Sequence, residues 1–534
     1  MSDQQRRRFG ILRSAVLRAR KTWLEKSELP GHTWPEGRVF TCATDCSGLE
    51  APLFGMKLLG LQFRQCWGSD IDENARRWIR AQGMCPLLFH NAIERRLPEH
   101  VEPCCLDGYW LGFPCQPFSA ASVRARGFQD KRTEVLRAGL RAMMHARPFW
   151  AVLENVKGIV RARHQKGFKK MLTQEGITDH YAVAIARICP HANLREPIRR
   201  PRVFFLCTRK DCALTDDQNL VKELLQNVCA EVQGSLPPAE LEDYLRDVVK
   251  KEDVGRENKG KQGAPTEKKW VEQHGQVREQ LGLPYLSDMT ELSRKANHLP
   301  GLTLRQQSLV EIKTHGLQKH DYPVILDVSQ SLGRAPMLSG VCPCLTRGAQ
   351  PVMISGDGRG RLLSSHECLA LMGFPLSMTT MPTSVGDAAL HALAGNSMHI
   401  TSIALATMLA ISLVNWEATG RGDAPPVLRR LSCKTKVTTP LQQVTREVES
   451  SGSMGKKKQR IAGRPKIKRR LSDIFSRVPA SCAVRKPRPR RAQHISSTPE
   501  RRSSASSASI RARTPGKAVA AKQPKRRLSD IYES

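Results

Sequence analysis

The segment of residues 106–119 constrains the fold of this chain more than any other. Residues 106–111 are mostly apolar and predict a buried strand, which Gly112 and Pro114 end. Cys115 follows in the loop, and the helical spacing of residues 132–145 predicts a helix further on. Loops at the carboxyl ends of strands are where open α/β sheets carry their chemistry. The segment therefore predicts an α/β fold with a functional loop around Cys115.

Two earlier strands predict a βαβ opening. Residues 39–45 form an apolar run that leads into a turn of small residues at 46–48, and residues 63–68 form a second run that ends near Asp70. A small-residue turn lets the backbone approach a ligand, and an acid after the second strand can accept hydrogen bonds from ribose hydroxyls. The pattern is compatible with an adenosine site. An ordinary βα turn explains these residues equally well.

A third apolar run places a carboxylate near the cysteine. Residues 149–153 predict a strand that ends at Glu154. If this strand lies in the same sheet as 106–111, a thiol and a carboxylate converge at one edge. Such a pair can act on a single substrate.

The charge of the chain is uneven. The formal net charge is +35, and residues 421–534 alone hold 30 Lys and Arg against 7 Asp and Glu. A polyanion, most often nucleic acid, is the partner that this asymmetry favours. A solvated tail that only keeps the protein soluble is the simpler alternative.

Cysteine usage and hydropathy indicate a reduced, non-membrane protein without a metal. The 16 cysteines include no CxxC…CxxC frame, so we expect no zinc site. The apolar segment 403–414 is too short to span a membrane. Residues 1–37 are rich in arginine and predict a basic arm or surface helix, with an organelle transit peptide as the alternative.

The basic tail contains a repeated unit. Residues 468–475 recur almost unchanged at 525–532, and a partial copy lies at 429–432. Each copy places a serine after two arginines and a leucine, so we expect a basic-directed kinase to act at Ser432, Ser472 and Ser529. Basic runs at 456–460 and 486–491 favour import into the nucleus. The composition of the tail predicts disorder.

Taken together, the motifs resemble those of the cytosine-C5 DNA methyltransferase family, in that family's order. The matching motifs are Cys46-Ser47-Gly48-Leu49, Asp70-Ile71-Asp72, residues 112–119, Glu154-Asn155-Val156, Arg200-Pro201-Arg202, residues 361–375 and Ala394-Gly395-Asn396-Ser397. They cover residues 39 to 415, apart from a long variable gap. This resemblance implies a Rossmann-like, mostly parallel sheet that binds S-adenosylmethionine, with an inserted, smaller target-recognition domain.

The resemblance also implies roles for individual residues. Cys115 is the expected nucleophile that attacks C6 of a flipped-out cytosine in double-stranded DNA, with its pKa lowered by the loop position. Glu154 is expected at N3 of the base, Arg202 near O2, and Arg200 is expected to orient the base or Glu154. The cofactor is expected to contact Cys46, Ser47, Gly48, Leu49, Asp70, Ile71, Asn396 and Ser397.

The sequence departs from the family pattern in the first cofactor loop, where Cys46 replaces an aromatic residue and Glu50 a glycine. Two alternatives stay open, and these departures bear on the second of them. An RNA cytosine-C5 methyltransferase would use the same chemistry on the same fold, and a catalytically weak nucleic-acid-binding protein would keep only the fold.

The predicted organisation has five parts. These are a basic N-terminal arm (1–37), the first part of the catalytic domain (39–207), a target-recognition region with an insert (208–346), the closing part of the catalytic domain (347–418) and a disordered basic tail (419–534).

Overall fold

The computed structural model describes residues 3–30, 33–94, 106–119, 126–245, 265–286, 299, 301–375 and 385–419. The predicted tail, including Ser432, Ser472 and Ser529, lies outside these residues, apart from Thr419.

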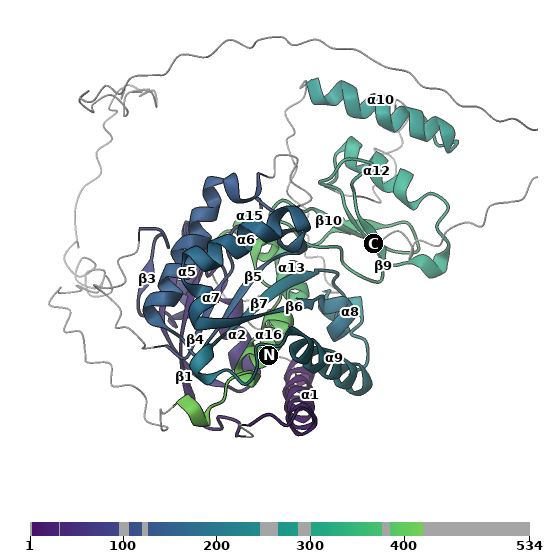
Figure 1. Ribbon diagram of the computed structural model, residues 1–534. Helices are drawn as coiled ribbons and strands as arrows, with labels where there is room; N and C mark the ends of the chain where they lie inside the picture. The colour runs from purple at the N-terminus through teal and green to yellow at the C-terminus, as the bar shows by residue number, and fades with distance from the viewer. Residues whose placement is uncertain are drawn as a thin grey trace, which may run out of the picture. The chain divides into compact units, whose positions relative to one another are not determined.

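A seven-stranded sheet forms the centre of the catalytic part, in the order β3-β2-β1-β4-β5-β7-β6 (Figure 1). The strands are β1 (Val39–Asp45), β2 (Gln62–Ser69), β3 (Leu88–Phe89), β4 (Gly108–Leu111), β5 (Trp150–Val156), β6 (Tyr181–Ile188) and β7 (Arg202–Arg209). β3, β2, β1, β4 and β5 pair in parallel, and β7 pairs antiparallel with both β5 and β6. The predicted mostly parallel α/β sheet is confirmed.

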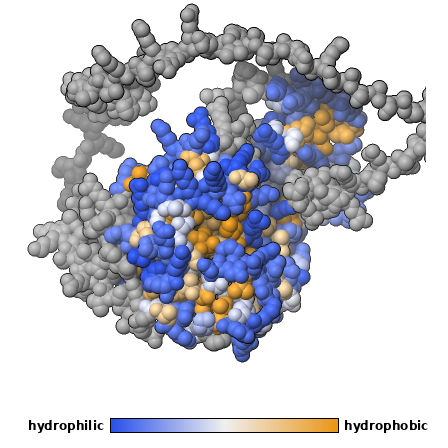
Figure 2. Space-filling model, viewed as in Figure 1, coloured by the Kyte–Doolittle hydropathy of each residue, from blue (hydrophilic) through white to orange (hydrophobic). Residues whose placement is uncertain are grey.

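Helices cover both faces of this sheet. On one face a hydrophobic core gathers residues of α1 (Asp3–Lys26), α2 (Ala51–Leu58), α3 (Glu73–Gln82), α9 (Gln218–Ser235) and α16 (Ile400–Ser412). On the other face a second core gathers α5 (Glu134–Ala146), α6 (Ala162–Gln174) and α7 (Ile177–His180). Among the described residues, the remaining α-helices are α8 (Pro190–Leu194), α10 (Pro265–Gln280), α12 (Leu304–Thr314), α13 (Ser365–Leu371) and α15 (Asp387–Asn396). Hydrophilic residues cover most of the face shown in Figure 2.

Of the two forms expected for the N-terminal segment, an arm or a surface helix, the structure has the helix, α1, and packs one side of it into the fold. α1 buries Leu12, Val16 and Trp23 in the core that also contains α16. Arg8 donates to the carbonyls of Leu194 and Arg195, and both bonds require the helix to lie against the body. The arginine-rich composition hid an apolar stripe with helical spacing, which is why the segment is part of the fold.

A second, antiparallel sheet has its own small core. It contains β8 (Val324–Asp327), β9 (Met337–Ser339), β10 (Pro351–Ile354) and β11 (Gly360–Leu362), in the order β11-β10-β8-β9. Its extent differs from the predicted boundary at residue 346, because β10 pairs with β8 rather than with the large sheet. At the other boundary, α9 buries Val221, Leu224 and Val228 in the catalytic core.

One helical run among the described residues, Asp387–Ser412, is long and apolar enough to cross a membrane, and 89% of its apolar window is buried inside the fold. α16 packs against β5 and β7 as the central helix of one face. This degree of burial is typical of a core helix.

Candidate functional site

The loop that carries Cys115 begins where β4 ends and is held by β5. The amide nitrogen of Asn155, a fully buried residue, donates to the carbonyl of Phe113 at 3.0 Å. The carbonyl of Cys115 accepts from the N–H groups of Phe118 and Ser119, each at 2.9 Å, which closes a tight turn. Neighbouring parallel strands thus bring the two motifs together, and these hydrogen bonds hold the backbone around the cysteine.

The structure corrects the expected pKa of the Cys115 thiol, which is raised and not lowered. Burial raises the pKa of the Cys115 thiol, and the negative charge of Glu154 raises it further, while Arg202 and Arg200 oppose the shift. The predicted lowering of this pKa is therefore wrong. The effect of Glu154 on this pKa places Cys115 and Glu154 within electrostatic reach of each other.

Glu154 and Arg202 form an ion pair across two antiparallel strands. The register sets Val156 opposite Arg202, so Glu154, two positions away, shares a face of the sheet with both. Nε of Arg202 lies 2.9 Å from Oε1 of Glu154, and each side chain is only about an eighth exposed, at 13% and 12%. A partly buried pair of this geometry holds the carboxylate in one position.

Arg200 makes its described contacts away from Glu154. Its guanidinium donates to the carbonyls of Leu345, Gly395 and Ser397, the last at 2.6 Å, and the residue is 3% exposed. These bonds tie the paired-arginine strand to the segment that closes the catalytic domain. They favour a positioning role for Arg200 over the predicted direct orientation of the base or Glu154.

Cys344 is a thiol of this site that sequence reasoning missed. Its Sγ accepts from Nη1 of Arg200 and Nη1 of Arg202, both at 3.7 Å. Burial opposes ionisation, but the two guanidinium groups outweigh it and lower the pKa of the Cys344 thiol. The pairing of Ile198 with Cys342 brings the two segments together, although 144 residues separate Cys344 from Arg200.

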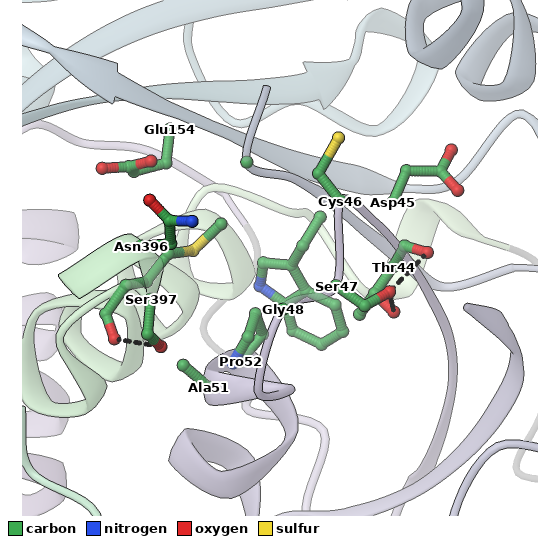
Figure 3. A pocket seen from close by; sticks show the side chains of 13 residues that line it. Thr44, Asp45, Cys46, Ser47, Gly48, Ala51, Pro52, Glu154, Asn396 and Ser397 are labelled. Carbon is green, nitrogen blue, oxygen red and sulfur yellow. Dashed lines mark hydrogen bonds between the residues drawn. The ribbon is translucent and has the colours of Figure 1, made fainter. Parts of the chain in front are cut away.

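A pocket with an empty volume of about 370 Å³, part of it open to solvent, connects the first loop with Glu154. Figure 3 shows Glu154 and Asn396 on one side of it and Cys46 and Ser47 on the other. It is lined by Thr44, Asp45, Cys46, Ser47, Gly48, Ala51, Pro52, Trp110, Gly112, Glu154, Asn396, Ser397 and Met398. Five of the eight predicted cofactor residues are thereby brought together.

The other three predicted cofactor residues lie elsewhere. Leu49 is completely buried in the core and offers no side-chain atom to a ligand. Asp70 accepts from the N–H of Gly48 at 2.8 Å, so it supports the first loop from β2. Ile71 is 70% exposed, which is unusual for a large apolar side chain and fits a surface that a flat ring can cover.

The cofactor loop is strained and internally bonded. Cys46 and Glu50 both adopt left-handed backbone conformations, with φ of 53° and 57°, and Gly48 has φ of 54°. Oε1 of the fully buried Glu50 accepts from Oγ1 of Thr44 at 2.9 Å and from Nε2 of Gln65 at 2.7 Å. These bonds tie the loop to β1 and β2, and strain of this kind concentrates at functional sites.

Burial raises the pKa of Glu50 to about 8, although the hydrogen bonds from Gln65 and Thr44 oppose the shift. At neutral pH this residue is therefore mostly a neutral carboxylic acid. Glu50, which stands where the family has glycine, thus keeps a backbone conformation that glycine adopts readily. Its buried side chain links the loop to Thr44 and Gln65.

The residues fit a nucleoside cofactor, whereas metal-binding clusters are absent from the part of the chain that the structure describes. The backbone of Gly48, the exposed Ile71 and the amide of Asn396 supply a close backbone approach, an apolar surface and a polar side chain. Missed residues of the pocket include Asp45 and Trp110, whose positions at the ends of β1 and β4 were the available signal.

Comparisons with known proteins agree with the motifs. The family model described as C-5 cytosine-specific DNA methylase matches residues 46–408. The chain is 31% identical over 153 residues to Type II methyltransferase M.HgiCI of Herpetosiphon aurantiacus, covering 28% of this chain and 34% of that protein. It is 28% identical over 192 residues to Type II methyltransferase M.XorII of Xanthomonas oryzae pv. oryzae, covering 34% and 43%.

The matched segments span between 33% and 50% of the curated relatives' own lengths. Among solved structures, the S. pombe Dnmt2 methyltransferase aligns with a TM-score of 0.43 at 14% identity, covering 70% of this chain and 98% of that one.

Proposed function

Because the chain belongs to the C-5 cytosine-specific DNA methylase family, we propose that it is a DNA (cytosine-5)-methyltransferase. The observation that carries this proposal is the position of Glu154. Its carboxylate lines the same pocket as the first cofactor loop, forms an ion pair with Arg202 and raises the pKa of Cys115. One carboxylate therefore lines the cofactor pocket and acts electrostatically on the nucleophile.

S-adenosylmethionine is the proposed cofactor, and when bound it supplies an electrophilic methyl group to the pocket. Ser47, Gly48, Asn396 and Ser397 would hold it from the two sides of the pocket. Asp70 keeps the first loop in place through Gly48, and Ile71 offers its exposed side chain to the adenine. The cytosine must leave the duplex to reach this site, because C5 and C6 are inaccessible inside the base stack.

The chain's residues then activate the ring. Cys115 loses its thiol proton to water, and Sγ forms a bond to C6 while the π-electron pair of the C5–C6 double bond is displaced through C5 and C4 toward N3. Glu154 stabilises the added charge by hydrogen bonding or proton donation at N3, and the guanidinium of Arg202 stabilises charge toward O2. The raised pKa of Cys115 fits this coupling, because neutralising Glu154 removes one cause of the shift.

Two further proposals concern the tail outside the described residues. We propose that it directs the protein to the nucleus, and that a basic-directed kinase modifies Ser432, Ser472 and Ser529, supported by the basic runs around them. Imaging of tagged chains with and without residues 420–534 tests the first proposal. Phosphopeptide mass spectrometry of protein from its native cells tests the second.

The experiment that tests the main proposal is transfer of labelled methyl groups from S-adenosylmethionine to duplex DNA, single-stranded DNA and structured RNA of the same sequence. Labelled 5-methylcytosine in DNA is the expected result. Label found in RNA alone would establish the RNA alternative. Cofactor binding by isothermal titration without transfer to any substrate would favour the nucleic-acid-binding alternative.

A further inference from the structure

We propose that the exposed basic side of α6 binds the phosphate backbone of duplex DNA beside the nucleophile loop, outside the predicted target-recognition region. This proposal rests on the proposed function and adds a DNA-contacting surface to it. The α6 basic face consists of Arg163, Lys166, Lys169 and Lys170 of α6, together with Lys157 and Arg161, which precede the helix.

The α6 basic face carries charge of one sign only. Residues 157–174 contain these six Lys and Arg residues and no Asp or Glu, and all six side chains are exposed. The opposite side of α6 buries His164, Phe168, Met171 and Leu172, whose spacing defines one helical stripe. Because that apolar stripe is buried in the core, α6 exposes no apolar side that could insert into a membrane.

These charges have no ion-pair partner among the described residues, in contrast to the basic residues of α1. On α1, Arg18 pairs with Glu231 at 2.9 Å and Lys26 pairs with Glu223. Glu175, the acid that directly follows α6, forms ion pairs with Arg137 and Arg141 of α5 at 2.8 and 2.9 Å. The α6 basic face therefore keeps its full positive potential, which attracts a polyanion.

Packing places the start of this face against the nucleophile loop. The ring of His164 lies edge-on to Phe118 with 5.4 Å between the centroids, and the N–H of Phe118 bonds to the carbonyl of Cys115 at 2.9 Å. Gly158 leaves no room for a side chain, since an added Cβ would lie 1.9 Å from the carbonyl oxygen of Phe118. A duplex that delivers a base to Cys115 thus passes close to the first basic residues of α6.

The buried imidazole of His164 packs against the nucleophile loop, and its surroundings favour the neutral form. Its Nε2 accepts from Nε of Arg163 at 3.1 Å, and burial, Arg163 and Arg161 together lower its pKa. Arg163 is in turn fixed near the loop by this bond. Arg163 and Lys170 are seven positions apart, about 10 Å along the helix axis. That length corresponds to roughly three nucleotides of a duplex strand.

The test compares two triple variants of the full chain with equal loss of charge. K166Q/K169Q/K170Q neutralises exposed positions of the α6 basic face, and R18Q/K21Q/K26Q neutralises exposed positions of α1, which packs on the other face of the sheet. Binding to a short fluorescent duplex is measured over a series of salt concentrations. The basic tail is unchanged in every protein, so its contribution to the salt dependence is common to all.

For K166Q/K169Q/K170Q we expect about tenfold weaker DNA binding and a loss of roughly two to three from the slope of log K against log salt, at about 0.9 per phosphate contact. Methyl transfer at saturating DNA should stay within about twofold of the parent, because no residue of the pocket changes. The α1 variant should match the parent in affinity and slope.

Equal slopes for the parent and the α6 variant would overturn the proposal, and so would a loss that the α1 variant reproduces. A slope change seen with duplex RNA but not with duplex DNA would also overturn it. The salt slope is independent of catalysis. A parent protein that methylates no DNA would therefore sink the proposed function, while the slopes would still decide whether the α6 basic face binds DNA.

Discussion

Arg202 reaches both Glu154 and Cys344: its Nε lies 2.9 Å from Oε1 of Glu154, and its Nη1 lies 3.7 Å from Sγ of Cys344. One guanidinium thus pairs with a carboxylate that lines the pocket and donates to a thiol 142 residues further along the chain. The site therefore holds two cysteines with opposite tendencies, since the pKa is raised at Cys115 and lowered at Cys344.

Replacing Glu154 by glutamine should change transfer and thiol reactivity in opposite directions. Methyl transfer should fall by about a hundredfold or more, because the group at N3 is lost. Alkylation of Cys115 by iodoacetamide should become faster at neutral pH, because the charge of Glu154 raises the pKa of the thiol. Mass spectrometry of the Cys115 peptide measures the second effect. Glu134→Gln, an exposed charge on α5, is the control, and unchanged alkylation in Glu154→Gln would contradict the assignment.

Cys115→Ala should abolish methyl transfer and leave duplex binding within about twofold of the parent, because only the covalent step is lost. Covalent trapping on duplexes that contain 5-fluorocytosine should also disappear, as seen by a band shift in denaturing gels. Cys189→Ala, which changes a partly buried thiol at the start of α8, should retain both properties. Full transfer by Cys115→Ala would remove Cys115 from the mechanism.

Glu50 should make stability depend on pH. Its pKa is raised by burial to about 8, whereas the unfolded chain releases this proton near the ordinary value of 4.5. The folded state therefore holds a proton that the unfolded state loses, so the free energy of unfolding falls as pH rises between these two values. As far as Glu50 contributes, the free energy of unfolding is highest below pH 4.5, and it stops falling above about pH 8.

Urea unfolding of Glu50→Gln across this range should lack that part of the slope, which amounts to roughly 1.4 kcal/mol per pH unit for one proton. Charges near Glu50 include Asp70, which also raises its pKa, while the neighbouring side chains of Gln65, Thr44 and Ser47 lower it. Parallel pH profiles for the parent and Glu50→Gln would show that the carboxyl does not hold its proton in the fold.

Arg200→Lys should weaken the binding of S-adenosylmethionine about tenfold or more, measured by isothermal titration. One ammonium cannot span the carbonyls of Leu345, Gly395 and Ser397, so the segment that carries Asn396 loses its support. Because the change also removes buried hydrogen bonds, the thermal midpoint should fall. The neighbouring exposed Arg199→Lys is the matched control. Cofactor affinity equal to the parent would rule out this positioning role.

Local patterns in the sequence were sufficient for the strands and for the chemistry of individual groups. Apolar runs that end in a small or polar residue predicted β1, β2, β4 and β5, and Cys115 and Glu154 followed because parallel strands end at a common edge. The packing of helix α1 into the core was not predicted, since its many arginines masked the apolar stripe that contains Leu12, Val16 and Trp23.

Tertiary structure alone decided the relations between distant residues. The clamp of Arg200 on Gly395 and Ser397, the thiol of Cys344 beside Arg202 and the raised pKa of Cys115 all depend on side chains that no local spacing brings together. Periodicity reports which face of an element is buried. Burial depth and the distances between charges set pKa values and partners, and these arise only when the whole chain has packed.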